Sequence, residues 1–391
     1  MSISLKKISF LLITFSVISF LIVYRGPCFL TEGIFEINEY QFYKYAKENG
    51  VLKGLLFVYE GAYYFKFWTN IATTFASFFS FEKAKLITTY FSVAAYFIIF
   101  SYILFFDSSL FIKDWHKIFA IFIVLFSPGM TPEIWMGSAH TREYFGIFAF
   151  ILLFNDCKNE NNIKKISTNF FIILSFLSSV WAMILAPAYF IKFYFKRNIH
   201  NLFFFMSSLF GSLVQFFIIM NFYFVDSVGT SRFQIQVEKI LSFIYNVPVR
   251  SFFGSTIPKF FLIESNIISL KYFNLTIIII SIILFFLIFI YLVRKKDFIL
   301  NLIFISFILI SSFALVGSLY SDFAGGRYAV VSSIILIFFV FRIFVLENNL
   351  ILKCFSGILI MFSLIVGLVE YKYKSPLPEL LTCKYHEIQN N

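Results

Sequence analysis

Repeated apolar runs of bilayer-spanning length constrain this chain more than any other feature of its sequence. A run of about 18 or more apolar residues with few charges is a candidate transmembrane helix. The composition points the same way, because 60% of the residues are hydrophobic, only 14% are charged and the mean hydropathy is +0.86. Soluble domains have about 45–50% apolar residues. We therefore expect an all-α, polytopic integral membrane protein.

The apolar runs predict about eleven transmembrane helices in a single membrane-embedded domain covering residues 1–391. A full crossing needs about twenty residues, so the third to sixth runs are open to being broken, re-entrant or misbounded. No small-residue cleavage site follows the first run, which we interpret as a retained span. The predicted spans are Ile8 to Tyr24, Leu86 to Phe106, Ile118 to Phe126, Tyr144 to Phe154, Thr168 to Val180, Met183 to Tyr194, Leu202 to Val225, Leu275 to Val293, Phe298 to Ser318, Ala329 to Val345 and Ile351 to Val369.

Lysine and arginine fall in alternate short loops, which predicts that those loops and the N-terminus are cytoplasmic. The formal net charge of +11 is then explained by membrane insertion and by contact with anionic lipid headgroups, so we expect no nucleic-acid partner. An odd number of spans places the C-terminus outside. The predicted exoplasmic segments are 25–85, 127–143, 226–274, 319–328 and the tail 370–391.

The first exoplasmic segment carries Glu32, Glu36 and Glu39 close to the first span. Asn38 as N-cap and Gln41 three residues later predict a short helix that ends before Gly50. Glu39 in the first turn would complement the helix dipole. Alternatively, a carboxylate on a rigid element above a span could act as a general base toward an acceptor hydroxyl.

The segment NEYQFYKYA, which begins at Asn38, resembles the DE-x-x-Y type of motif that follows the first span in membrane-embedded GT-C glycosyltransferases. Those enzymes often have the essential acid where this chain has Asn38, so the role would move to Glu39 or back to Glu36. The many spans, the long first exoplasmic segment and the outside tail resemble the serotype-converting O-antigen glucosyltransferases in particular.

This resemblance implies an inverting transfer of a hexose such as glucose from a polyprenyl-phosphate donor. The acceptor would be a lipid-linked O-antigen or other surface polysaccharide on the periplasmic face of a bacterial inner membrane. It also implies pathway partners, namely a flippase and the enzyme that makes the donor. We expect no metal or other cofactor, because no Cys and His spacing in the sequence is typical of a metal site.

The second exoplasmic turn groups ionisable residues at the mouth of a predicted span. His140 with Arg142 could hold the donor phosphate, while Glu133 or Glu143 positions a sugar. The alternative is that Arg142 pairs with Glu143 or Glu133 and only anchors a helix end.

Two further arginines are candidates for substrate binding. Arg327 and Tyr328 follow two glycines in an element that looks like the GRY element of related GT-C proteins, and Arg327 could meet a phosphate. An interfacial anchor is the alternative there. Arg250 is a candidate for phosphate or sugar contact, with a solvated loop as its alternative.

Two other functions share much of this composition. An O-antigen polymerase often has arginine and glycine spaced as R-x10-G, but the positions eleven residues after Arg232 and Arg250 are Phe243 and Phe261. A transporter needs charged groups or broken helices near the midplane. The predicted spans contain few interior ionisable residues, which favours the glycosyltransferase.

Overall fold

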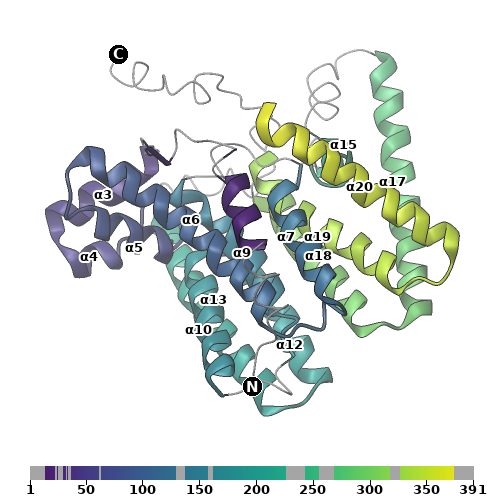
Figure 1. The fold of residues 1–391 in the computed structure, drawn as a ribbon, viewed down its shortest axis with the longest axis horizontal. Coiled ribbons are helices and arrows are strands. Elements are labelled where there is room, and N and C mark those ends of the chain that lie inside the picture. Colours follow the sequence, from purple (N-terminus) through teal and green to yellow (C-terminus); the bar gives the residue numbers. More distant parts are fainter. Residues whose placement is uncertain are drawn as a thin grey trace.

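The computed structural model describes residues 14–22, 24, 30–31, 33, 37–60, 63–128, 137–156, 162–225, 243–254, 268–317 and 326–373. Every regular element in these ranges is a helix, and their β-pairing is confined to an isolated bridge between Ser108 and Asn155 (Figure 1). The all-α class is therefore confirmed. The helices are α3 (Ile37–Asn49), α4 (Val51–Leu55), α5 (Phe67–Ala76), α6 (Phe81–Phe105), α7 (Asp114–Phe126), η1 (Ser138–His140), α9 (Thr141–Leu152), α10 (Asn162–Ser178), α11 (Val180–Ile184), α12 (Ala186–Phe195), α13 (Ile199–Val225), η4 (Tyr245–Val249), α15 (Arg250–Phe253), α17 (Ile268–Lys295), α18 (Phe298–Gly317), α19 (Gly326–Leu346) and α20 (Leu350–Tyr373).

Five helices of the described chain are long and apolar enough to cross a membrane, and a bent helix pair raises the number to six. The pair joins α10 to α11 and α12 through a bend of 110°. The expected count of about eleven is not confirmed by length and composition, because α7 and α9 have only 13 and 12 residues. The five are Phe81–Phe105, Ile199–Phe222, Phe298–Leu315, Ala329–Leu346 and Leu350–Glu370.

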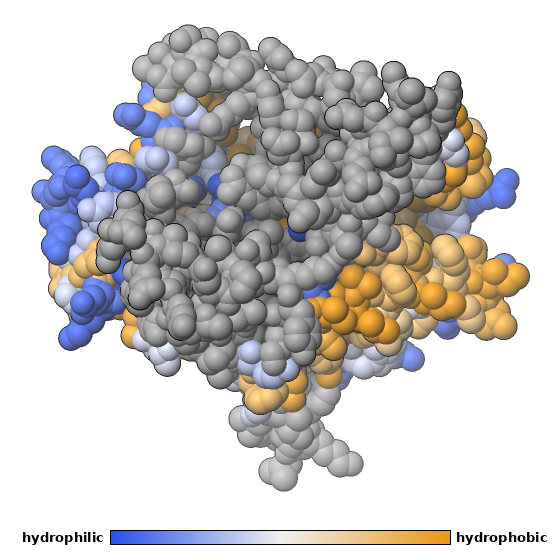
Figure 2. Space-filling view, turned by 90° about the horizontal axis from the view of Figure 1, so that it is seen from above, coloured by the Kyte–Doolittle hydropathy of each residue, from blue (hydrophilic) through white to orange (hydrophobic). Residues whose placement is uncertain are grey.

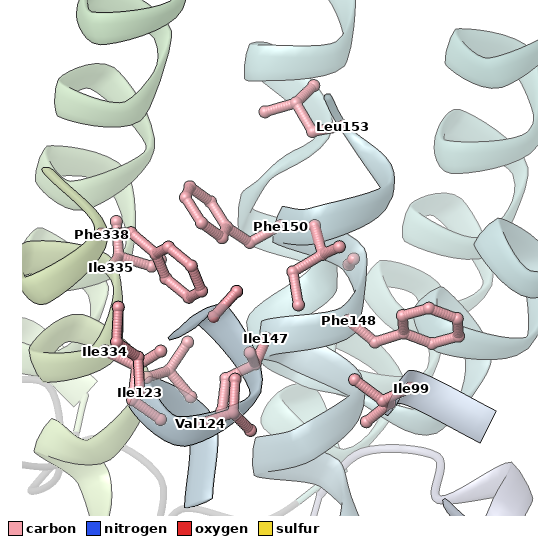
Figure 3. Close-up of a cluster of buried hydrophobic side chains, with 14 of the residues drawn as sticks. Ile99, Ile123, Val124, Ile147, Phe148, Phe150, Leu153, Ile334, Ile335 and Phe338 are labelled. Carbon is pink, nitrogen blue, oxygen red and sulfur yellow. The ribbon is translucent and has the colours of Figure 1, made fainter. Parts of the chain in front are cut away.

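The short helix α9 is the centre of the core. Each of its residues except Arg142 is buried, and Phe150 packs against Phe338 of α19 with ring centroids 5.7 Å apart. Figure 3 shows side chains of α6, α7, α9 and α19 gathered in one cluster that includes Val124 and Ile147. The predicted span from Tyr144 is thus a helix sheathed by other helices, which is the usual place for an apolar run of 10–14 residues.

Five turns between consecutive helices meet at one end of the bundle, which we call the basic end. The first two are joined by the Ser108–Asn155 bridge, and Lys192 near the third donates to the Asn155 carbonyl oxygen at 2.8 Å. Arg342, beside the fifth, donates to the Ser109 carbonyl oxygen at 3.4 Å. The five turns cover residues 106–113, 153–156, 196–198, 296–297 and 347–349.

Two ion pairs complete the connections at the basic end. Arg342 lies 3.4 Å from Asp297, and Lys295 lies 2.7 Å from Glu347. Loops that the charge pattern predicted to share one side of the membrane therefore do lie together. The compartment that they face remains a prediction.

In its described residues, the predicted first exoplasmic segment is mostly helical and folds as a layer of α3, α4 and α5 beside the bundle (Figure 1). Helix α3 ends at Asn49, as predicted, because Gly50 takes a left-handed φ of 83°. Its first residue is Ile37, so Asn38 lies inside the first turn instead of at the N-cap. Figure 2 shows hydrophilic residues on the side of this layer and hydrophobic residues on the opposite side of the molecule.

Gln215 attaches this layer to the bundle. It lies in the part of α13 that is long and apolar enough to cross a membrane, and its exposed fraction is 0%. Its Oε1 accepts a hydrogen bond from the Phe65 N–H at 2.9 Å, and its Nε2 lies 2.9 Å from the Phe65 carbonyl oxygen. The same Nε2 is 3.2 Å from the Phe176 carbonyl oxygen at the end of α10. One side-chain amide thus satisfies backbone groups of two other segments, a role that polar residues often have between membrane helices.

We predict that Gln215→Leu destabilises the protein by about 2–5 kcal/mol, because the buried N–H and C=O groups of Phe65 would lose their partner. Thermal unfolding of the purified protein in detergent measures this loss. Phe217→Leu is the control, since Phe217 lies on the exposed side of the same helix with an exposed fraction of 67%. Equal unfolding temperatures for the two variants would contradict the assigned role of Gln215.

Candidate functional site

Three helices converge on the short η1 turn that precedes α9. The Ser138 carbonyl oxygen accepts hydrogen bonds from Thr69 Oγ1 of α5 at 2.8 Å and from Thr141 Oγ1 at 2.7 Å. The Ala139 N–H donates to Glu39 Oε1 of α3 at 3.2 Å. The turn is therefore fixed from both sides, and the first and second predicted exoplasmic segments meet at it.

Glu39 is fully buried, with an exposed fraction of 0%. It lies in the first turn of α3, where the helix dipole favours a negative charge. The Ala139 N–H adds a donor from an element 100 residues away in the chain. A buried carboxylate needs such hydrogen-bond donors to remain stable. Glu39 therefore complements the dipole of α3 and also joins α3 to η1. The helix dipole does not explain this second, tertiary contact.

Glu143 is the second fully buried carboxylate of this region. Its Oε1 accepts from Arg142 Nε at 2.7 Å and lies 3.8 Å from His140 Nδ1. Burial raises the pKa of Glu143, but the nearby charge of Arg142 and the imidazole of His140 outweigh it and lower the pKa to about 2. The alternative pairing of Arg142 with Glu143 is thus present in the structure. It also fixes the direction of the Arg142 side chain.

Lys66 is a buried cation that our sequence interpretation missed. Its side chain is in the α3–α5 layer, with an exposed fraction of 3%. Its Nζ lies 5.4 Å from the ring centroid of Tyr64, and Arg142 Cζ lies 5.4 Å from the same ring. A single lysine inside the aromatic run YYFKFW was the available signal, since an isolated cation in an apolar run is costly unless it has a role.

We call Glu39, Lys66, His140, Arg142 and Glu143 the Glu39 cluster. It combines two buried carboxyl groups with two basic side chains and an imidazole at one end of α9. A carboxylate can accept a proton, and lysine and arginine can bind phosphate. Within the described residues, no group of three or more His, Cys, Asp or Glu side chains could hold a metal ion.

The remaining predicted site residues fall in other places. Glu36 and Glu133 lie outside the described residues. Arg327 and Tyr328 form the first turn of α19, of which only the backbone is described. Arg250 is buried in α15, where it is not the solvated group of the alternative interpretation.

Arg250 belongs to a different contact region from the Glu39 cluster. Helix α15 packs against α20, and Ser363 Oγ donates to the Ser251 carbonyl oxygen at 2.6 Å. The structure therefore brings together Glu39, His140, Arg142 and Glu143 from the predicted set.

No family model, no curated protein and no solved structure matches the chain. The arrangement of the Glu39 cluster is accordingly the main basis for a functional assignment.

We predict that the stability of the Glu143→Gln variant falls less steeply than that of the wild type as the pH is lowered. The pKa of Glu143 is lowered from its ordinary value of 4.5 to about 2. The ion pair therefore contributes its full stabilisation at pH values above 4.5, and this stabilisation is lost as the pH falls toward 2. Unfolding temperatures measured from about pH 5 to about pH 3 should fall more steeply for the wild type than for the variant. The exposed Glu48→Gln serves as control; parallel wild-type and Glu143→Gln curves would contradict the pairing.

Proposed function

We propose that the protein is a GT-C-type membrane glycosyltransferase that moves a hexose from a polyprenyl-phosphate donor to a lipid-linked polysaccharide. The observation that carries this proposal is the hydrogen bond from the Ala139 N–H to Glu39 Oε1. It joins the acid of the DE-x-x-Y-like segment to η1, the turn that contains His140 and directly precedes the first turn of α9 with Arg142. Two segments that the sequence singled out independently are thereby parts of one site.

The chemistry of such a site is a direct displacement. The acceptor hydroxyl oxygen attacks the anomeric carbon, the bond from that carbon to the donor phosphate breaks, and the polyprenyl phosphate leaves with the electron pair. Glu39 takes the hydroxyl proton as general base. Arg142 and Lys66 stabilise the negative charge that develops on the leaving phosphate. Attack opposite to the leaving group inverts the anomeric centre.

The buried state of Glu39 sets a condition on this mechanism. An acceptor reaches the carboxylate only if it displaces packing around η1. His140 and Glu143 then position the substrate while the pair between Arg142 and Glu143 keeps the guanidinium oriented. Among the described residues, the Arg142 guanidinium bonds to a carboxylate only through Nε, so its terminal nitrogens can meet a phosphate.

The proposed membrane arrangement follows the alternation of the chain. Consecutive helices from α6 onward run back and forth, and their short turns meet at the basic end. If α7, α9 and α12 are short crossings inside the bundle, the chain has the eleven spans that the sequence predicts. The basic end then faces the cytoplasm, and the Glu39 cluster faces the periplasm of a bacterial inner membrane.

We predict that Glu39→Gln abolishes sugar transfer, with a rate loss of about 10²–10⁴-fold as is typical for removal of a general base. The test compares the surface polysaccharide of cells that lack the gene with that of cells complemented by each variant. Glu48→Gln is a matched control, because it changes an exposed glutamate of the same helix. It should restore the side-branch sugar, whereas Glu39→Gln should not, at equal protein levels.

Other outcomes of the same comparison exclude the proposal. Wild-type decoration in the Glu39→Gln strain would remove Glu39 from the mechanism. Loss of long polysaccharide chains with single repeats retained in the deletion strain would instead identify a polymerase.

A further inference from the structure

A polar pocket at the basic end is separate from the Glu39 cluster. It has a volume of about 320 Å³, and most of its lining residues belong to the tip of the hairpin formed by α12 and α13. Figure 1 shows this hairpin. Helix α9 separates the two places, since η1 precedes its first residue and Asn155 follows its last turn. Twelve residues at about 1.5 Å each give a separation on the order of 18 Å. The pocket is lined by Ser109, Asn155, Asp156, Lys192, Lys196 and Arg197, with two further asparagines.

Three cations and one carboxylate line this pocket, which gives it a positive balance. Lys192 is its buried floor, with an exposed fraction of 5% and its Nζ on the Asn155 carbonyl oxygen at 2.8 Å. Lys196 and Arg197 are exposed and make no ion pair with any described carboxylate. Asp156 contributes the single negative charge. An anionic group can therefore enter without displacing an existing ion pair of these two exposed cations.

The pocket is built on a fixed backbone. Asn201 Nδ2 donates to the Lys196 carbonyl oxygen at 2.7 Å, and the Asn201 N–H donates to Asn198 Oδ1 at 2.7 Å. The second bond caps the N-terminus of α13. The positive end of a 27-residue helix consequently adds to the three cations. Such a preorganised site favours the localised binding of a phosphate group over a diffuse attraction of anions to a basic surface.

An apolar groove of about 440 Å³ adjoins the pocket along α12, α17 and α18. The pocket and the groove use neighbouring faces of α12, because Lys192 and Lys196 line the first while Ile191 and Phe195 line the second. Lys196 Nζ lies 5.2 Å from the ring centroid of Phe298, which lines the groove. The cationic and apolar parts are therefore continuous.

We propose that this composite site binds a membrane phospholipid of net negative charge. Its phosphate would occupy the pocket among Lys192, Lys196 and Arg197, and an acyl chain would lie in the groove. Charge complementarity selects the phosphate, and the open apolar groove selects a lipid over a free anion. The site is about the length of α9 away from the Glu39 cluster, so it is independent of the proposed transfer reaction.

Titration of the purified protein with lipid in detergent tests this proposal. Phosphatidylglycerol should raise the unfolding temperature and bind in native mass spectrometry, whereas phosphatidylcholine should do so far more weakly. The double variant Lys196→Gln with Arg197→Gln leaves the buried Lys192 in place. It should weaken phosphatidylglycerol binding by about five-fold for each lost charge, the effect typical of a cation at a lipid surface.

A matched control removes two charges from the same end outside the pocket. Lys165→Gln with Lys353→Gln should bind phosphatidylglycerol like the wild type, since neither residue lines the site. Equal weakening in both double variants would show that only net charge matters and would overturn the site. Val293→Trp narrows the groove and should weaken the binding of the lipid without changing the binding of inorganic phosphate. If inorganic phosphate stabilises the protein as well as the lipid does, the ligand is a free anion and the lipid assignment is wrong.

Discussion

The fold depends on how buried charged and polar groups find partners in an otherwise apolar chain. Each such group costs several kcal/mol unless it is hydrogen-bonded or paired. Glu39 meets this requirement by accepting from the η1 backbone, and Glu143 meets it through Arg142. Gln215 does the same for the backbone of Phe65. The contacts of Glu39 and Gln215 hold the α3–α5 layer against the bundle. The stability of the layer and the position of Glu39 therefore have the same origin.

Helix α9 organises the molecule around two chemically different ends. Its N-terminal side carries the ion pair of Arg142 with the buried Glu143, and its C-terminal side leads to Asn155 at the basic end. Because the helix is sheathed on all sides by apolar residues, it holds the two ends at a fixed separation. Under the proposed function, the outer end would handle a carrier-bound sugar. The basic end would contact anionic lipid, which would also keep the bundle in its orientation.

The composition and the charge pattern were sufficient to predict the helical class and the grouping of the short turns at one end. Both follow from the physics of a single segment: an apolar run of sufficient length folds as a helix, and cations mark its end. Gly50 likewise predicted a helix end through its own backbone freedom. Such local signals do not require knowledge of the partners.

The rest depends on contacts between distant segments. An apolar run such as that from Tyr144 to Phe154 has the same sequence pattern whether lipid or protein surrounds it. The sequence therefore could not distinguish a core helix from a transmembrane helix. The roles of Lys66 and Gln215 depend on the contact of Lys66 with Phe42 of α3 and on the hydrogen bond between Phe65 and Gln215 of α13. The fixed Ala139 N–H is a backbone group that no side-chain pattern reports.

The central claim is that the Glu39 cluster and the basic end face opposite sides of the membrane, and thiol labelling of intact cells tests it most directly. Asn348→Cys, in the exposed turn before α20, reports the basic end, and Glu48→Cys reports helix α3. In a background in which the native cysteines are serine, a membrane-impermeant maleimide should label the thiol introduced by Glu48→Cys in intact cells. It should reach the thiol introduced by Asn348→Cys only after permeabilisation. Labelling of both positions from the same side would contradict the account.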